Sequence, residues 1–275
     1  MLQLAINWDV SPVLFDLGFF QLRWYSLGFV CAFIFGFALL KKHYRTEQIP
    51  DEKLDKLLIY VVLATILGAR LGHVFFYDWE HFSQRPFLEI FLPIQIEGGF
   101  KFTGYQGLAS HGGAIALLIA LFIYSKKVLK KPFHWILDRI APSIALAGAF
   151  IRFGNLMNSE IIGKPTGSDF GFKFLKVDEL ARHPAQLYES IGYLLLFFVL
   201  QALLKKGILQ KPWRSFSIFI FALFAIRFMV EYVKTSQGGS IENQLDGLLS
   251  TGQWLSIPFL ILGLVLYVFS GKSKA

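Results

Sequence analysis

Apolar residues gather into long runs along this chain, and short polar segments separate them. Seven runs reach the roughly 17 to 25 residues that a helix needs to cross a bilayer. They cover residues 17–40, 54–76, 108–125, 135–156, 185–204, 216–233 and 252–270. Pro142 lies inside the fourth run, and membrane helices tolerate proline where neighbours satisfy the freed carbonyl. The pattern predicts an all-α polytopic membrane protein with seven transmembrane helices, folded as a single integral membrane domain over residues 1–275.

The connections between the runs carry an uneven distribution of basic residues. Fourteen lie after the first, third, fifth and last runs, and seven lie on the opposite side. The larger set is Lys41, Lys42, Arg45, Lys53, Lys126, Lys127, Lys130, Lys131, Lys205, Lys206, Lys211, Arg214, Lys272 and Lys274. Because cytoplasmic loops are enriched in Lys and Arg, we expect the N-terminus outside and the C-terminus in the cytoplasm. The two long loops, residues 78–107 and 159–184, are then extracytoplasmic.

The composition supports a membrane protein and argues against one class of partner, nucleic acid. The 275 residues are 55% hydrophobic, include 30 Phe and are 17% charged, against about a quarter charged in a soluble domain. The net charge of +8 could suggest nucleic acid, but the basic residues stand where membrane topology requires them, so we expect no nucleic-acid partner. No basic leader or cleavage site precedes the first run, and we expect no removable signal peptide. Cys31 is the only cysteine, which excludes an internal disulfide and a cysteine-based metal site.

The segment that follows the fourth run is unusually polar. It contains Arg152, Asn155, Asn158, Glu160 and Gly163. A charge at membrane depth costs several kcal/mol unless it is paired, so it marks a functional site by default. Further polar residues of this kind are Arg70, His73, His111, Arg227 and Glu231.

Arg152 and Arg227 suit the binding of an anionic group. Arginine stays charged in a low dielectric and can hold two oxygens of one anion with its planar fork. Asn155 adds neutral donors and acceptors of the kind that orient a headgroup. A structural alternative stands beside this interpretation, because Arg227 and Glu231 are four residues apart and could form an ion pair on one helix face. Arg152 could equally belong to such a pair.

His111 is the candidate general base. Two glycines follow it, and they allow a ligand or another helix to approach the backbone closely. Its alternative role is a helix-entry residue bonded to a carbonyl. His73 lacks a partner at metal-ligand spacing and His183 is better explained as a loop anchor, so we expect no metal. Motifs of serine hydrolases, nucleotide-driven pumps and zinc proteases are missing from the sequence.

Several motifs occur in a characteristic order. They are Arg23-Trp-Tyr25-Ser-Leu-Gly28, Gly68-Ala-Arg70-Leu-Gly72, His111-Gly-Gly113, Arg152-Phe-Gly-Asn155 with Asn158 and Glu160, Gly163-Lys-Pro-Thr166, His183-Pro-Ala-Gln186-Leu-Tyr188-Glu189 and Arg227-Phe-Met-Val-Glu231. In this order the chain resembles bacterial prolipoprotein diacylglyceryl transferases nearly from end to end. It departs from the family pattern at Ile151 and Lys164, where Gly and Arg are usual, and at Ser110 before His111.

The resemblance implies an activity. Such enzymes move the diacylglyceryl group of phosphatidylglycerol to the thiol of a lipobox cysteine at the signal peptide of a preprolipoprotein, forming a thioether and releasing glycerol 1-phosphate. This is the first step of bacterial lipoprotein maturation, in the cytoplasmic (inner) membrane. The implied partners are phosphatidylglycerol, the preprolipoprotein signal peptide and membrane lipid, and no cofactor is needed.

The resemblance also implies roles for particular residues. His111, Arg152 and Arg227 are the expected catalytic residues. The expected substrate-binding residues are Tyr25, Arg70, Asn155, Asn158, Glu160, Gly163 and Glu231. Two alternatives from other classes stay open at this point. A transporter or anion channel would use Arg152 and Arg227 as its substrate site, and a non-catalytic membrane scaffold would tolerate substitution of Arg152 and His111.

Overall fold

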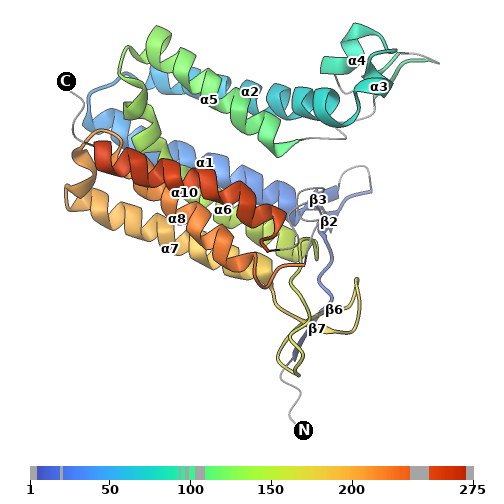
Figure 1. Ribbon diagram of the computed structural model, residues 1–275. Coiled ribbons are helices and arrows are strands. Elements are labelled where there is room, and N and C mark those ends of the chain that lie inside the picture. Colours follow the sequence, from blue (N-terminus) through green and yellow to red (C-terminus); the bar gives the residue numbers. More distant parts are fainter. Residues whose placement is uncertain are drawn as a thin grey trace. The chain divides into compact units, whose positions relative to one another are not determined.

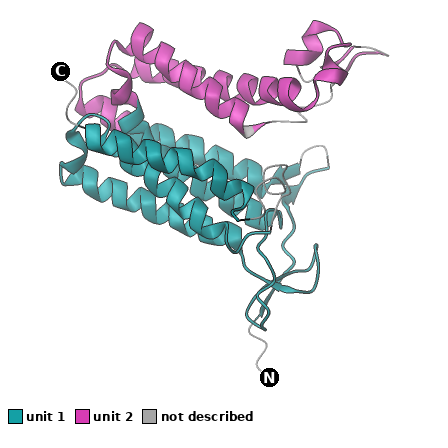
Figure 2. Ribbon diagram, viewed as in Figure 1, with its two compact units in different colours: residues 1–40, 137–275 teal, residues 41–136 magenta. Residues whose placement is uncertain are grey.

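The computed structural model describes residues 5–18, 21–92, 94–96, 99–102, 109–235 and 248–270. Part of the predicted loop 78–107, the start of the predicted third span at Leu108, and the tail residues Lys272 and Lys274 lie outside these ranges. The chain divides into two compact units, residues 1–40 with 137–275, and residues 41–136 (Figure 2). The helices α1 and α6 each continue from one unit into the other. The single domain expected from the sequence stays a prediction.

Helices dominate the described residues (Figure 1). The long ones are α1 (Trp24–Thr46), α2 (Asp51–Tyr77), α5 (Ser110–Tyr124), α6 (Phe133–Met157), α7 (Ala185–Lys205), α8 (Arg214–Val230) and α10 (Thr251–Phe269). The short ones are α3 (Trp79–Phe82), α4 (Phe87–Phe91), the π-helix η1 (Ser125–Leu129) and the 3-10 helix η2 (Ile208–Gln210). Six described helices are long and apolar enough to cross a membrane, α5 and η1 forming one of them, while α8 has 17 residues. A polytopic, mostly helical membrane protein is therefore confirmed.

The boundaries of the first predicted span were wrong at both ends. Residues 21–23 form the strand β3 (Gln21–Arg23), which pairs antiparallel with β2 (Val13–Asp16), and the helix begins at Trp24. Gly18 lies between β2 and β3 and adopts a φ of 79°, a value that favours glycine. At the other end α1 continues past Leu40 through several basic residues to Thr46. Hydropathy reports where the apolar side chains stop, and a helix can extend beyond that point because polar residues also favour it.

The prediction of an all-α chain was wrong outside the long helices. Strand β1 (Ala5–Trp8) pairs in parallel with β6 (Gly171–Phe174), which pairs antiparallel with β7 (Ala181–Arg182). A third pair joins β4 (Ile94–Gln95) to β5 (Lys101–Phe102). These strands have two to four residues, too short for an alternating pattern to stand out. The parallel pair also joins segments that lie far apart in the sequence, which no local pattern can reveal.

The larger unit is a helix bundle, and α6 is the most deeply buried of its candidate membrane spans. The Phe35 ring of α1 stacks on Phe150 of α6 at 5.8 Å between centroids. The Ser190 hydroxyl of α7 donates to the Ala149 carbonyl of α6 over 2.9 Å. The Phe224 ring of α8 stacks on Phe259 of α10 at 4.2 Å, and Figure 1 shows α7, α8 and α10 running side by side. Such contacts provide the packing and interhelical hydrogen bonds that hold membrane helices together.

In the smaller unit, α5 packs closely against α2 because both helices have small residues at the crossing. A Cβ added at Gly112 would come within 2.4 Å of the Gly68 carbonyl oxygen and 2.6 Å of the Gly72 Cα. The Ala109 amide donates to the Ala69 carbonyl over 2.9 Å, which fixes the entry to α5. Small residues spaced four apart are a common device for close helix crossings in membranes. His111 directly precedes Gly112 and therefore lies in the first turn of α5, beside this crossing.

Candidate functional site

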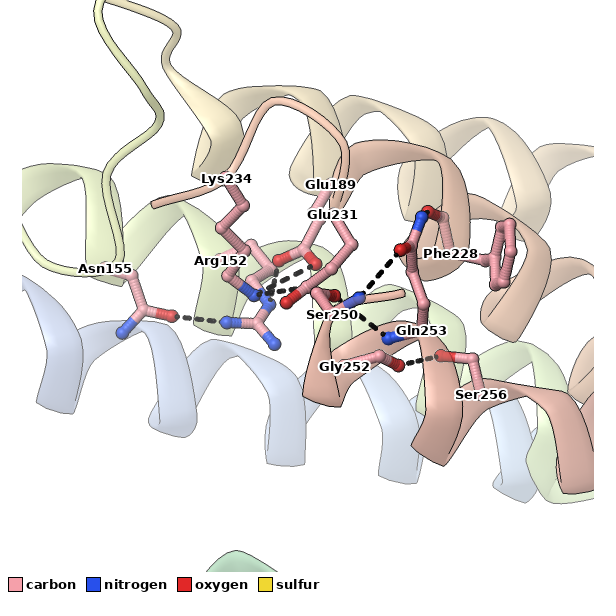
Figure 3. Close-up of polar contacts among 10 residues, drawn as sticks. All are labelled: Arg152, Asn155, Glu189, Phe228, Glu231, Lys234, Ser250, Gly252, Gln253 and Ser256. Carbon is pink, nitrogen blue, oxygen red and sulfur yellow. Dashed lines mark hydrogen bonds and ion pairs between the residues drawn. The ribbon is translucent and has the colours of Figure 1, made fainter. Parts of the chain in front are cut away.

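The site begins at Arg152, in the last two turns of α6. Its Nε lies 2.6 Å from the Glu189 Oε2, and its Nη1 donates to the Asn155 Oδ1 over 3.3 Å (Figure 3). Glu189 comes from the second turn of α7 and is 0% exposed. Two helices thus bring a cation and an anion together within the bundle, and their attraction offsets part of the cost of removing each charge from water.

A second cation meets the same carboxylate. Lys234, which follows α8, is 6% exposed, and its Nζ lies 3.7 Å from the Glu189 Oε1. The same Nζ lies 3.5 Å from the Glu231 Oε2. The four side chains therefore alternate in charge, in the order Arg152, Glu189, Lys234 and Glu231, and Figure 3 shows them converging from α6, α7 and the end of α8. We call these four residues the charge cluster.

The carboxylate of Glu231 is seated at the beginning of α10. A Cβ added at Gly252 would lie 2.4 Å from its carboxyl carbon, so only glycine leaves room for it. Ser250 and Gln253 form a reciprocal capping box at the same helix end. The N-terminus of a helix carries a partial positive charge, which stabilises a carboxylate there. Helix α10 thus helps to hold one end of the charge cluster.

A group of amides extends the cluster toward the loop after α6. Asn155 and Asn158 each donate from Nδ2 to a different oxygen of Glu160, both over 3.1 Å. Gln186 of α7 donates to the backbone carbonyl of Glu160 over 2.6 Å. Tyr25, at the start of α1, interacts electrostatically with Glu160 and Arg152. The structure therefore brings together Arg152 with four of the predicted substrate-binding residues.

Gly163 lies where three segments of chain cross. Its amide donates to the His183 carbonyl over 2.9 Å, and the next amide, of Lys164, donates to the Val233 carbonyl over 2.7 Å. An added Cβ at Gly163 would come within 2.4 Å of the His183 oxygen. The glycine is therefore required for this crossing, and His183 lies at it as the loop anchor that the sequence predicts. The crossing fixes the segment that carries Lys234.

The loop after this crossing is held by an ion pair outside the membrane-spanning helices. The Arg182 Nε donates to both oxygens of Asp178, over 3.0 and 3.1 Å. These hydrogen bonds hold the pKa of the Asp178 carboxyl below its ordinary value. A depressed folded-state pKa means that the pair stabilises the protein at neutral pH. That contribution is lost as the pH falls below about 3.9, the ordinary value, and through the folded-state pKa.

The ion pair of Arg227 with Glu231, which the sequence left open as a structural alternative, is not found among the described residues. The ion partner of Glu231 within the described ranges is Lys234, three residues further on. The Arg227 Nε is buried and has no hydrogen-bond partner among the described residues. Arg227 and Arg152 both interact electrostatically with Tyr193 of α7, which relates Arg227 to the charge cluster. A buried donor without a partner costs about 1 to 3 kcal/mol, so this atom is suited to a ligand acceptor.

Two predicted residues lie in the smaller unit. His111 is exposed, and its ring lies beside the rings of Phe76 and Tyr77, 5.4 and 5.6 Å between centroids. Arg70 is 7% exposed and donates to the backbone carbonyls of Ile90 and Glu89 over 3.1 and 2.9 Å. These contacts give Arg70 a role in holding the segment around α4, and its binding of substrate stays a prediction.

A family model described as prolipoprotein diacylglyceryl transferase matches residues 12–269. The chain belongs to this family. Similar proteins carry the name phosphatidylglycerol–prolipoprotein diacylglyceryl transferase. One from Bacteroides fragilis is 42% identical over 278 residues, covering 100% of this chain and 98% of that protein. Relatives from Tolumonas auensis and Chloroherpeton thalassium are each 40% identical, covering 98% of this chain and 98% and 96% of their own lengths.

Sequence reasoning did not assign two members of the charge cluster. Glu189 was noticed only as the last residue of a family motif, and Lys234 only as a basic residue between predicted spans. Glu189 had a signal that could have been used, because a carboxylate within an apolar run must be paired. Lys234 had none, since a lysine next to a predicted span is ordinary. No group of three His, Cys, Asp or Glu that could hold a metal is found in the described parts of the chain.

Proposed function

We propose that this chain transfers the diacylglyceryl group of phosphatidylglycerol to the cysteine thiol of a prolipoprotein lipobox. The observation that carries the proposal is the gathering of Arg152, Arg227 and Lys234 at one end of an apolar helix bundle. Membership in the prolipoprotein diacylglyceryl transferase family supports it across nearly the whole chain. The family also favours transfer over the transporter and scaffold alternatives.

The reaction leaves a limited task to the protein. The thiolate sulfur attacks the diacylglyceryl carbon that bears the phosphate, a carbon–sulfur bond forms, and the carbon–oxygen bond breaks. Glycerol 1-phosphate leaves with the electron pair of that bond, and the product is a thioether. The substrate supplies the nucleophile, so the protein must remove the thiol proton and stabilise the departing phosphate.

The basic side chains of the site can donate hydrogen bonds to the phosphate of the leaving group. Arg227 has a buried Nε without a partner in the described chain. The Lys234 Nζ stands 3.5 and 3.7 Å from its two carboxylates, longer than the 2.7 to 3.2 Å of a good N–H···O hydrogen bond. Both residues therefore have donor capacity that phosphate oxygens can use. Arg152 adds a guanidinium held in place on two sides, which reduces the reorganisation needed when charge develops on the leaving group.

His111 is our candidate for the base that takes the thiol proton. It is exposed and stands at the first turn of α5, and a neutral imidazole nitrogen can accept the proton of a thiol. We assign headgroup binding to Tyr25, Asn155, Asn158, Glu160 and Glu231, with Gly163 holding the backbone crossing beside them. No metal or other cofactor enters this mechanism.

We also propose that α8 crosses the membrane as one of seven spans. At about 1.5 Å per residue its helix is roughly 26 Å long, close to the 30 Å of the hydrocarbon core. The N-terminus is then outside, the C-terminus is in the cytoplasm, and the membrane is the bacterial inner membrane. Cysteines introduced at residues 126–131 should react with an impermeant reagent only after the cells are opened. Labelling in intact cells would overturn this orientation.

The activity test uses the purified chain with phosphatidylglycerol and a lipobox peptide. We expect glycerol phosphate release in equal amount to thioether formed, and none when the peptide cysteine is replaced by serine. Release without peptide would indicate hydrolysis. Passage of an anion across vesicles without any thioether would favour the transporter alternative.

A further inference from the structure

Glu189 stands out among the charged residues because both of its oxygens face cations from different segments. Oε2 lies 2.6 Å from the Arg152 Nε, and Oε1 lies 3.7 Å from the Lys234 Nζ. Its side chain is fully buried, so water does not share in neutralising it. One carboxylate thus sets the places of two cations that would otherwise repel each other in a low-dielectric surrounding.

The ion pair also decides which part of Arg152 is available. Glu189 meets the guanidinium at Nε, the nitrogen nearest the side-chain stem. The two terminal nitrogens lie at the far edge, where Nη1 already contacts Asn155. A planar guanidinium fixed at its stem has one orientation, so the contact with Glu189 determines where the two terminal nitrogens of Arg152 lie.

We propose that Glu189 is a positioning residue for the transfer reaction, which holds Arg152 and Lys234 in the arrangement that receives the phosphate leaving group. This inference rests on the proposed function. Glu189 itself does not touch the substrate. It keeps the two cations together before the phosphate arrives, so that the site does not have to assemble during the reaction.

Glu189→Gln gives the proposal a distinctive kinetic signature. The variant keeps the size of the side chain and removes its charge, so the half-buried Arg152 and the buried Lys234 lose their shared anion. A phosphate-bearing lipid can replace that anion, and we expect the KM for phosphatidylglycerol to stay level or fall. The kcat should fall about 10- to 100-fold, the usual cost of losing a residue that orients a catalytic group. A residue with a purely structural role would lower the amount of folded protein without this split.

A double-mutant cycle with Arg152→Lys tests whether Glu189 acts through Arg152. We expect Glu189→Gln to cost less than about 3-fold in kcat when Arg152 is already lysine, because residues that act as one unit are not additive. Glu47→Gln is the matched control. The Glu47 Oε2 lies 3.0 Å from the Lys131 Nζ and accepts from the Trp135 Nε1 over 2.8 Å, so it too joins two donors, in the smaller unit. Its kcat should stay within about 2-fold of the unmodified protein.

Several outcomes would overturn the proposal. They are an equal loss of kcat from Glu189→Gln in both backgrounds, a raised KM with unchanged kcat, or the same kinetic change in Glu47→Gln. If Glu189→Gln does not fold, the Glu189→Asp variant tests the proposal instead, since it keeps the negative charge and shortens the side chain. An unchanged kcat in Glu189→Asp would then contradict the positioning role of Glu189. Absence of transfer by the unmodified chain would instead refute the proposed function, so the two failures are distinguishable.

Discussion

Two arginines, the buried Arg70 and the half-buried Arg152, lie one in each compact unit and are held in opposite ways. Arg70 donates to two backbone carbonyls, and its guanidinium lies 4.6 Å from the centroid of the Phe82 ring. Arg152 instead meets side chains: it pairs with Glu189, donates to Asn155 and interacts with Tyr193. Backbone carbonyls are permanent partners, whereas a carboxylate and an amide can share a cation with an arriving anion. The kind of partner therefore separates a structural arginine from one suited to a ligand.

The same contrast applies to the two units as a whole. In the smaller unit the close contact is apolar, between the glycines of α2 and α5, and the exposed His111 stands at its edge. In the larger unit the contact is ionic and links α6, α7 and the segment after α8. Taken by itself, the larger unit holds charges that suit an anion, and His111 of the smaller unit stays the base proposed from the sequence.

Replacement of His111 tests the part assigned to the smaller unit and has the largest expected effect. General-base assistance is typically worth about 100- to 10,000-fold, and a free thiol has a pKa near 8.5, so little thiolate is present at neutral pH. His111→Gln should bind phosphatidylglycerol nearly normally and lose most transfer. Raising the pH should restore part of the rate, which a pH profile of kcat would measure. Nearly full activity with a flat profile would make His111 a helix-entry residue.

Replacement of Arg152 tests the part assigned to the larger unit. Arg152→Lys keeps the charge and loses the planar fork. Loss of one charged contact to the leaving group costs on the order of 100- to 1000-fold in rate. We expect a folded protein with this deficit in thioether formation. Turnover close to that of the unmodified protein in both Arg152→Lys and Arg152→Gln would return Arg152 to a structural ion pair.

Replacement of Arg70 sharpens the comparison between the arginines. Lysine cannot reach both carbonyls as the guanidinium does, and a buried acceptor left without its donor costs about 1 to 3 kcal/mol. Arg70→Lys should lower the melting temperature in detergent, and the folded fraction should keep its kcat and KM. A raised KM for phosphatidylglycerol with an unchanged melting temperature would support the substrate-binding role predicted from the sequence.

Cys31 provides the smallest effect and serves as a control within the larger unit. It lies in α1 and is half-buried. Because the prolipoprotein supplies the reacting sulfur, Cys31→Ala should keep transfer within a few-fold, the cost of a small packing change. Mass spectrometry of the protein incubated with phosphatidylglycerol alone should find no lipid on Cys31. Complete loss of activity in a folded Cys31→Ala protein would point to a covalent intermediate on the enzyme and contradict the proposed mechanism.

The sequence by itself determined the helices and the principal cation of the site. A long apolar run is a local property, and it identified the cores of the membrane-spanning helices even where their ends were wrong. Arg152, Asn155 and Asn158 were also found locally, because polar residues at the end of an apolar run demand an explanation. Glu160 belongs to the same polar segment. Tyr25 joined them through the family resemblance, and in the structure it interacts electrostatically with both Glu160 and Arg152.

Only the tertiary structure decided which charges meet. The sequence offered Glu231 as the partner of Arg227 from helical spacing alone, whereas the structure pairs Glu231 with Lys234 and brings Glu189 to Arg152. The strand pairing that sets Ala5 opposite Gly171 is of the same kind. Helical periodicity relates residues three or four apart, and the choice among distant partners depends on how the helices and connecting segments pack. That packing is a property of the whole chain, so no single segment of the sequence contains it.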